Sequence, residues 1–558
     1  MILTVITLAC LLSNITSAQN IHCYDSVTTL DKDAPLGSNC LEITAEGLIS
    51  RVFQGQKISK GHVYPGLWDG HGHLLQYGEL LHSVNLFGSS SLNDTLSKVE
   101  KYAAAHPQAG TASEWIRGVG WDQAVFGRMP MALDLDSNQD LQGKYIMLDR
   151  VDVHCVWVSS AVLELLPSPF PDVPGGDVIR NPGPGVFCDN AMDVVMQYWP
   201  KPSKERRIEF LRTAERSLNS VGLVGIHDAG VISENLDIYR ELTDSRDWKL
   251  RIYAMVECKK RNTFCGDDVT IFKNDRGMLH MRGVKLFADG ALGSWGSAMI
   301  EPYSDKPSTT GSLLVNASTL NQLALDWSLA GYQVNIHAIG DLANRYAIDA
   351  FESAYAQLCP DQPADLCQAR HRFRIEHAQI IHPADQIRMF DMGIIPSIQP
   401  THATSDMAYA EDRLGERRTK EEAYRMRSLL PLNLTLGSDF PVEPPNPFEG
   451  IFAAITRKSP KTGLGKDGSE NGWHAQEALD LQQALRGFTI GPARAAFLEG
   501  KAGILKEGAF ADWIVLDNRL EDISSDEIRH VRVRQTWVGG QLAYERRAEE
   551  PGEIKEEL

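Results

Sequence analysis

Over most of the chain, short apolar runs alternate with amphipathic stretches. The apolar runs at 221–226, 249–254 and 393–399 have the length and composition of buried β-strands. The stretches at 204–221 and 343–358 instead carry apolar residues at helical spacing. Alternating strands and helices build a parallel sheet, and about eight such units predict an α/β fold with a closed (β/α)8 TIM-like barrel. In such a barrel the functional side chains lie at the C-terminal ends of the strands.

The segments on either side of this alternating region are rich in strands and turns. Residues 19–64 show little helical periodicity, and residues 496–548 return to strand-like runs. We expect these two segments to form one small β-sandwich domain beside the barrel, which then spans 65–495. A stretch rich in proline, glycine and tryptophan at about 110–200 interrupts the barrel pattern. We expect it to be an insertion above the barrel mouth.

The two ends of the chain carry targeting features. Residues 1–18 form an apolar run followed by small residues up to Ala18, which predicts a signal peptide; the alternative is a buried N-terminal strand. The acidic tail at 549–558 ends in Lys555, two glutamates and Leu558, which resembles the retrieval signal of the endoplasmic reticulum. Together they predict a protein of the endoplasmic reticulum lumen that a retrieval receptor binds, with secretion as the alternative.

The cysteine content favours an oxidising compartment. Nine cysteines are present, and eight remain once Cys10 leaves with the signal peptide. Spacing does not fix the connectivity, but near neighbours in sequence are plausible disulfides. These pairs are Cys23 with Cys40, Cys258 with Cys265, and Cys359 with Cys367, which leaves Cys155 and Cys188 over.

Three asparagines match the acceptor pattern for N-glycosylation: Asn93, Asn316 and Asn433. We expect Asn433 to be unmodified, because it falls inside a predicted core strand. The remaining composition is ordinary for a globular protein, with 43% hydrophobic and 23% charged residues among 558. The net charge of −18 disfavours nucleic acid as a partner, since phosphate binding needs a concentrated basic surface. Apart from the first residues, no segment is typical of a transmembrane span.

Four histidines stand at or beside the ends of strand-like runs. His71 and His73 are two residues apart, so in a strand both side chains point to the same face and reach one ion. Such a pair alone is also common among surface and core histidines. His337 and His377 each end a further run, and single histidines of this kind are often structural. All four on strands of one barrel indicate a metal centre, and imidazole nitrogen suits zinc.

Asp439 and Lys285 complete the candidate centre. Asp439 follows an apolar run; as a carboxylate near a metal it would accept a proton from water, and the alternative is a helix-capping or turn aspartate. Lys285 lies in another run and points into the barrel. An unmodified ammonium there would repel divalent metals, whereas a lysine carboxylated on its side-chain nitrogen would bridge two of them. The alternative is a lysine paired with Asp289 or another carboxylate.

The motifs resemble those of the amidohydrolase superfamily, and within it of amidohydrolase family 3, the group that includes N-substituted formamide deformylase. The likeness runs from about residue 60 to 517, and its most specific parts are 65–73 and 283–293. Residues 118–122, 152–154 and 503–516 add to it. The resemblance implies that His71 and His73 bind a first divalent metal, His337 and His377 a second, and that Lys285 bridges them while Asp439 acts as the base.

The resemblance also implies the reaction: a metal-dependent hydrolysis of a carbon–nitrogen bond, in a non-peptide linear amide or an N-substituted formamide, by an activated water molecule. Asp439 would take the proton of the water and pass it to the leaving amine. His154 would hydrogen-bond the substrate or be a packed core histidine. The alternatives are hydrolysis or lysis of another bond, such as an ester, a lactone or a carboxyl group, and a non-catalytic lumenal binding protein. The sequence leaves open whether one or two metals bind, and whether the protein is a homodimer.

Overall fold

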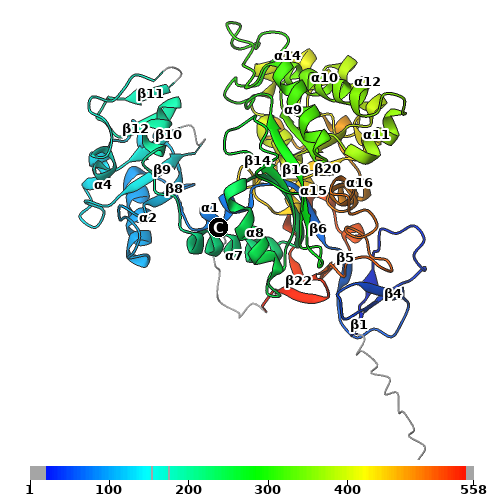
Figure 1. Ribbon diagram of the computed structural model, residues 1–558. Helices are drawn as coiled ribbons and strands as arrows, with labels where there is room; N and C mark the ends of the chain where they lie inside the picture. The colour runs from blue at the N-terminus through cyan, green and yellow to red at the C-terminus, as the bar shows by residue number, and fades with distance from the viewer. Residues whose placement is uncertain (1–19, 152–154, 174–175, 548–558) are drawn as a thin grey trace, which may run out of the picture. The chain divides into compact units, whose positions relative to one another are not determined.

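The computed structural model describes residues 20–151, 155–173 and 176–547 (Figure 1). The expected signal peptide, the acidic tail and His154 lie outside the described residues. The chain divides into two compact units, one formed by Met1–Gly72 with Arg216–Leu558 and the other by His73–Glu215. The second unit is wider than the insertion that we expected at 110–200.

The first unit contains a barrel of parallel strands, which confirms the predicted fold. Its strands, in the order in which they pair, are β6 (Leu67–Gly72), β13 (Leu223–Ile232), β14 (Arg251–Glu257), β16 (Leu279–Phe287), β17 (Gln333–Ala338), β18 (Arg374–His377), β19 (Ile395–Ile398) and β20 (Thr435–Leu436). The short strand β15 (Phe272–Lys273) adds to β16 in the antiparallel direction. The segment after β20 pairs with the end of β6 and closes the barrel. Asp439 N–H donates to the His71 carbonyl at 2.7 Å, and Gly72 and Phe440 form a parallel bridge.

Helices connect most of these strands, as the amphipathic stretches predict. They are α8 (Leu236–Asp244), α9 (Ala317–Leu329), α10 (Asp341–Leu358), α11 (Ala364–His371), α12 (Pro383–Met392), α13 (Pro400–Asp406), α14 (Ala410–Glu421), α15 (Pro447–Thr456), α16 (Leu481–Gly487) and α17 (Ile490–Ala495). Several begin at a proline, whose missing N–H costs nothing in the first turn. α12 is followed by its capping residue Gly393, which has a φ of 66°, a conformation that glycine adopts without strain.

Strands from both ends of the chain pack together in the first unit. One sheet holds β1 (Asn20–Cys23), β3 (Cys40–Ile43) and β4 (Ile49–Phe53), and the other holds β2 (Ser26–Val27), β5 (His62–Pro65), β21 (Trp513–Leu516), β22 (Val533–Val538) and β23 (Gln541–Glu545). β5 and β21 pair in the antiparallel direction, although more than 400 residues separate them in the sequence. Leu41, Val63 and Trp513 are fully buried in the core that the two sheets share.

The second unit is built on one mixed sheet. Its strands, in pairing order, are β7 (Val84–Asn85), β8 (Ile116–Trp121), β9 (Ile146–Arg150), β10 (Cys155–Val158), β12 (Val186–Asp189) and β11 (Gly176–Ile179). Its helices are α1 (Leu74–Leu81), α2 (Leu92–Ala105), α3 (Gln123–Phe126), α4 (Ala132–Asp136), α5 (Ser160–Leu163) and α6 (Asp193–Met196). α7 (Lys204–Ser220) runs from this unit into the first. Because side chains alternate along a strand, Trp157 packs in one core and Val156 in another.

The disulfides extend the expected pairing. Cys23–Cys40, Cys258–Cys265 and Cys359–Cys367 are bonded as predicted. Cys155 and Cys188, which the sequence left over, form a fourth disulfide. The antiparallel register of β10 and β12 places them directly opposite each other, which their separation of 33 residues concealed.

The structure also tests the expected position of Asn433 and the expected absence of a membrane span. β20 begins only at Thr435, and Asn433 is exposed in a left-handed turn with a φ of 61°, so its placement inside a core strand was wrong. Among the described residues, no helix is both long enough and apolar enough to cross a membrane.

Candidate metal centre

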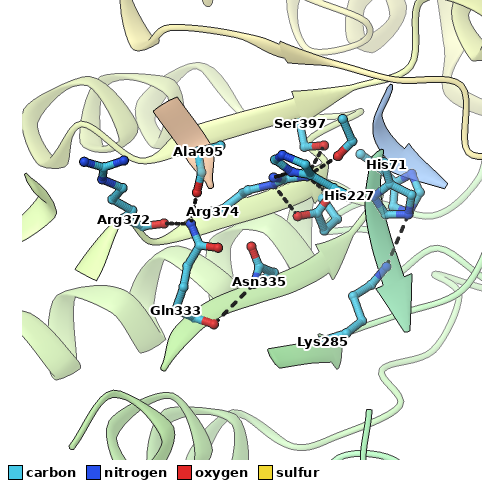
Figure 2. Close-up of polar contacts among 12 residues, drawn as sticks. His71, His227, Lys285, Gln333, Asn335, Arg372, Arg374, Ser397 and Ala495 are labelled. Carbon is cyan, nitrogen blue, oxygen red and sulfur yellow. Dashed lines mark hydrogen bonds and ion pairs between the residues drawn. The ribbon is translucent and has the colours of Figure 1, made fainter. Parts of the chain in front are cut away.

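β6 delivers the first histidines to the C-terminal end of the barrel. Asp69 and His71 share one face of the strand, and His73 follows the strand directly. The His71 ring is fully buried, with Nε2 lying 3.4 Å from Asp439 Oδ1 and 3.3 Å from Lys285 Nζ (Figure 2). His71, His73 and Asp439 each offer one ligand atom, and these atoms lie within 4.8 Å of one another.

β17 and β18 supply the other two predicted histidines. On β17, Gln333, Asn335 and His337 are spaced by two, so they face the same side of the sheet. His377 ends β18, and its φ of 73° is rare for a residue other than glycine. This left-handed backbone breaks the alternation of the strand, and the His377 ring lies 4.4 Å from that of His337 and 4.8 Å from that of His71 between centroids.

Asp439 lies where the first and last strands meet. Its φ of 62° is also in the left-handed region, where a residue other than glycine is strained, and such strain clusters at functional sites. Its two carboxylate oxygens face different rings: Oδ1 faces His71, and Oδ2 lies 3.8 Å from Nε2 of His402. His377, His402 and Asp439 form a second group whose ligand atoms lie within 4.8 Å of one another.

His402 is the residue that the sequence analysis missed. It lies in the first turn of α13, directly after β19, a strand that the sequence predicts. A histidine a few residues beyond the end of a predicted barrel strand was the available signal. The ring is largely buried, with 14% of the side chain exposed, and it stacks over that of His377 at 6.0 Å between centroids.

His337 and His377 are suited to bind a metal because burial keeps both rings neutral. Burial lowers the pKa of His337 to about 3, with the nearby lysine ammonium acting in the same direction. Burial also holds the pKa of His377 well below its ordinary value, and the His337 ring adds to this. Neutral imidazoles beside a carboxylate are a donor set that fits zinc or a similar divalent ion.

Lys285 lies within this cluster, and it forms no ion pair with any residue that the structure describes. Its side chain is buried, and no carboxylate of the described residues lies within salt-bridge distance of its Nζ. Asp289, the partner considered from the sequence, instead accepts backbone N–H groups from Ala298, Ile339 and Gly340. Burial lowers the pKa of Lys285 from its ordinary value, although the more distant charges of Glu376 and Asp439 oppose this.

A network of buried polar side chains contacts His71 through its Nδ1 atom (Figure 2). His71 Nδ1 lies 2.5 Å from Glu376 Oε2, and the Arg374 guanidinium lies 2.5 Å from Glu376 Oε1. Arg374 also donates to the Ser397 hydroxyl at 3.0 Å and contacts His227 Nδ1 at 2.5 Å. Burial alone would raise the pKa of Glu376, but the charge of Arg374 and the hydrogen bond with His71 hold it well below its ordinary value. An ionised Glu376 fixes the hydrogen on His71 Nδ1 and leaves Nε2 available as a ligand.

Asp69 fastens the last strand to the first. It accepts hydrogen bonds from the backbone of His71 and from both the backbone and the hydroxyl of Ser438. Gly437 must be a glycine, because a Cβ there would lie 2.5 Å from an oxygen of Asp69 and from His71 N. Burial raises the pKa of Asp69 to about 7, and its hydrogen bonds oppose this. Asp69 and Asp289 therefore support the strands that carry the candidate ligands.

The structure thus brings most of the predicted site residues to one end of the barrel. His71, His73, His377, Lys285 and Asp439 surround a common region. His337 lies beside His377, but its Nε2 is 3.6 Å from Asp289 and belongs to neither of the two ligand groups. His154 lies outside the described residues.

Comparison with known proteins identifies the family of this chain. The profile of the Amidohydrolase family matches residues 60–544, and the chain therefore belongs to this family. Protein LONG AFTER FAR-RED 3 of Arabidopsis thaliana is 31% identical over 533 residues, which cover 91% of this chain and 84% of the plant protein. N-substituted formamide deformylase of Arthrobacter pascens is 24% identical over 518 residues, covering 88% and 89% of the two chains.

A solved structure shares the fold. It belongs to an uncharacterised metal-dependent hydrolase from Pyrococcus horikoshii, with a TM-score of 0.74 and 24% identity. The match covers 91% of this chain and 99% of that protein. The family match and the shared fold together identify this chain as a member of the Amidohydrolase family with a barrel fold.

Replacing Glu376 with glutamine tests the role of the buried network. The variant keeps the shape of the side chain but loses the charge that orients His71, so we expect metal affinity to fall roughly 10- to 100-fold. Isothermal titration of metal-free protein with zinc measures this loss. Glu352→Gln, at a half-exposed site on α10, is the matched control and should bind zinc as the wild type does. Wild-type affinity in Glu376→Gln would show that Glu376 does not position His71.

Proposed function

We propose that this protein hydrolyses the carbon–nitrogen bond of a non-peptide linear amide or an N-substituted formamide. The observation that carries the proposal is the convergence of several histidines, Asp439 and Lys285 at the C-terminal end of an amidohydrolase barrel. The likeness to N-substituted formamide deformylase, at 24% identity, favours this bond. Hydrolysis of an ester or a lactone, or a decarboxylation, is the competing reaction, since a fold does not fix the chemistry.

His71 and His73 would hold one divalent ion, zinc by the chemistry of the donors, and His377 with His337 would take part in holding a second. Such ions make water nucleophilic at neutral pH and polarise a substrate carbonyl. The residues supply the rest. Asp439 accepts the proton of the attacking water on a carboxylate oxygen and donates it to the departing amine nitrogen. Glu376 keeps His71 in the required tautomer, with its hydrogen on Nδ1.

Lys285 is proposed to be carboxylated on its side-chain nitrogen. The reaction joins the amine nitrogen to the carbon of carbon dioxide and releases one proton, which turns the lysine into an anion. Two features support it: the side chain is buried beside His71, and its ammonium form would have no carboxylate partner within salt-bridge distance among the described residues. A buried cation without a partner is costly, whereas an anion there would attract metal ions.

We also propose that the protein works in the lumen of the endoplasmic reticulum. Four disulfides support an oxidising compartment. Asn93, Asn316 and Asn433 are all exposed, as glycan acceptors must be. The tail from Lys555 to Leu558 would keep the protein there through a retrieval receptor.

Replacing Asp439 with asparagine tests the base. An amide cannot accept the proton of water, so kcat on a panel of linear amides and N-substituted formamides should fall by about 10²- to 10⁴-fold. Mass spectrometry of the metal content should show that metal stays bound. Asp412→Asn, at an exposed position on α14, is the control and should leave kcat unchanged. Full activity of Asp439→Asn would exclude Asp439 as the base, and esters as the only good substrates would shift the assignment to the competing reaction.

Removal and return of metal tests the carboxylated lysine. Protein stripped with a chelator should be inactive, and zinc with bicarbonate should restore more activity than zinc in buffer depleted of carbon dioxide. In Lys285→Met, bicarbonate should make no difference, because the amine that reacts with carbon dioxide is gone. Equal recovery of the wild type with and without bicarbonate, after the bound carbon dioxide has been removed, would contradict carboxylation.

Fusing the last residues of the chain to a secreted reporter tests the location. With the sequence from Lys555 to Leu558 at its end, the reporter should stay inside cells, and with Leu558 replaced by aspartate it should reach the medium. A reporter that is secreted in both forms would leave secretion as the location.

A further inference from the structure

We propose that His402 is a metal ligand, and that it shares one ion with His377 and Asp439. The inference rests on the proposed function, because it assumes that the centre works with bound metal. It goes beyond the family resemblance, whose ligand set does not include His402. It also gives the two carboxylate oxygens of Asp439 separate partners, one at each metal position.

The position of His402 follows from the start of α13. β19 ends at Ile398, and Pro400 opens the helix immediately afterwards, so the first turn of α13 lies at the C-terminal end of the barrel. His402 is in this turn, and its side chain is mostly buried, with 14% exposed. The ring therefore faces the same end of the barrel as the ligands on the strands.

The distance from His402 to Asp439 suits two ligands of one ion. His402 Nε2 lies 3.8 Å from Asp439 Oδ2, which is too long for a direct hydrogen bond. Zinc binds nitrogen and oxygen at about 2.0 to 2.2 Å, so two atoms on one tetrahedral ion lie roughly 3.3 to 3.6 Å apart. The observed distance is close to this range. The ligand atoms of His377, His402 and Asp439 also lie within 4.8 Å of one another.

The free ring nitrogen of His402 needs a partner. Nε2 is buried, and within the described part of the chain it has no hydrogen-bond partner. A buried polar atom left unpaired costs free energy, and such atoms in folded proteins are nearly always satisfied. A metal ion between His402 and Asp439 would satisfy the nitrogen and use the space that separates the two side chains.

His377 is already oriented for this ion. Its Nδ1 lies 2.9 Å from Oε1 of Gln399, and because an amide oxygen only accepts, Nδ1 carries the hydrogen. Nε2 of His377 then keeps its lone pair for a metal. Gln399 directly precedes α13, so the residues at one helix start both orient His377 and provide His402.

Metal titration of His402→Ala tests the assignment. Wild-type protein, stripped and then titrated with cobalt(II), should bind two ions per chain. The variant should keep one at wild-type affinity and bind the other at least roughly tenfold more weakly, as the loss of a ligand requires. Ser405→Ala, an exposed position on the same helix, should bind both ions normally. Two ions at wild-type affinity in His402→Ala would overturn the proposal.

A second variant keeps the proposal testable if the alanine variant folds poorly. His402→Cys should give a thiolate-to-cobalt charge-transfer band in the near ultraviolet, because the thiolate would bind the ion directly. A folded, cobalt-loaded cysteine variant without that band would overturn the proposal, whether the wild type binds one ion or two. Failure of the wild type to bind any ion is a different result, because it would refute the proposed metal-dependent function itself.

Discussion

The closure of the barrel between its first and last strands is the constraint on which the candidate centre depends. Asp439 N–H donates to the His71 carbonyl, and Asp69 on β6 accepts hydrogen bonds from Ser438. Gly437 allows the two backbones to approach this closely. Since His71 belongs to the first strand and Asp439 follows the last, both reach one place only if the sheet closes. The candidate metal centre is therefore assembled by the fold as a whole rather than by any local motif.

Polar groups inside the barrel continue below this centre. Arg374, Glu376 and His227 are all fully buried, and each is held by charge or hydrogen bonding to another. Removing one member of such a network would leave an unpaired charge in the interior. The free-energy cost of that charge is far larger than the stability that an exposed ion pair contributes. The network thus ties the tautomer of His71 to the integrity of the barrel core. It explains why a hydrolase of this design can place several ionisable groups in a dry interior.

The sequence predicted the barrel and the pairing of its two ends because strand–helix alternation is a local, repeated signal. It also predicted His71, His73, His377, His337, Lys285 and Asp439, since each lies in or beside a strand-like run. His402 was not predicted as a site residue, because it lies on a helix and because its role depends on the strand ends that lie near it in space. The Cys155–Cys188 disulfide was not predicted for a similar reason, because only the register of β10 and β12 places the two residues opposite each other. The left-handed backbone of His377 and Asp439 leaves no mark in the sequence at all.

The central claim is that Asp439 lies between two metal positions at the C-terminal end of the barrel strands. The most direct measurement is an anomalous difference map from crystals of the zinc-loaded protein, recorded on both sides of the zinc absorption edge. The account predicts two peaks, one beside His71 and His73 and one beside His377 and His402, with Asp439 in contact with both. Strong zinc peaks elsewhere, with none within reach of Asp439, would contradict it.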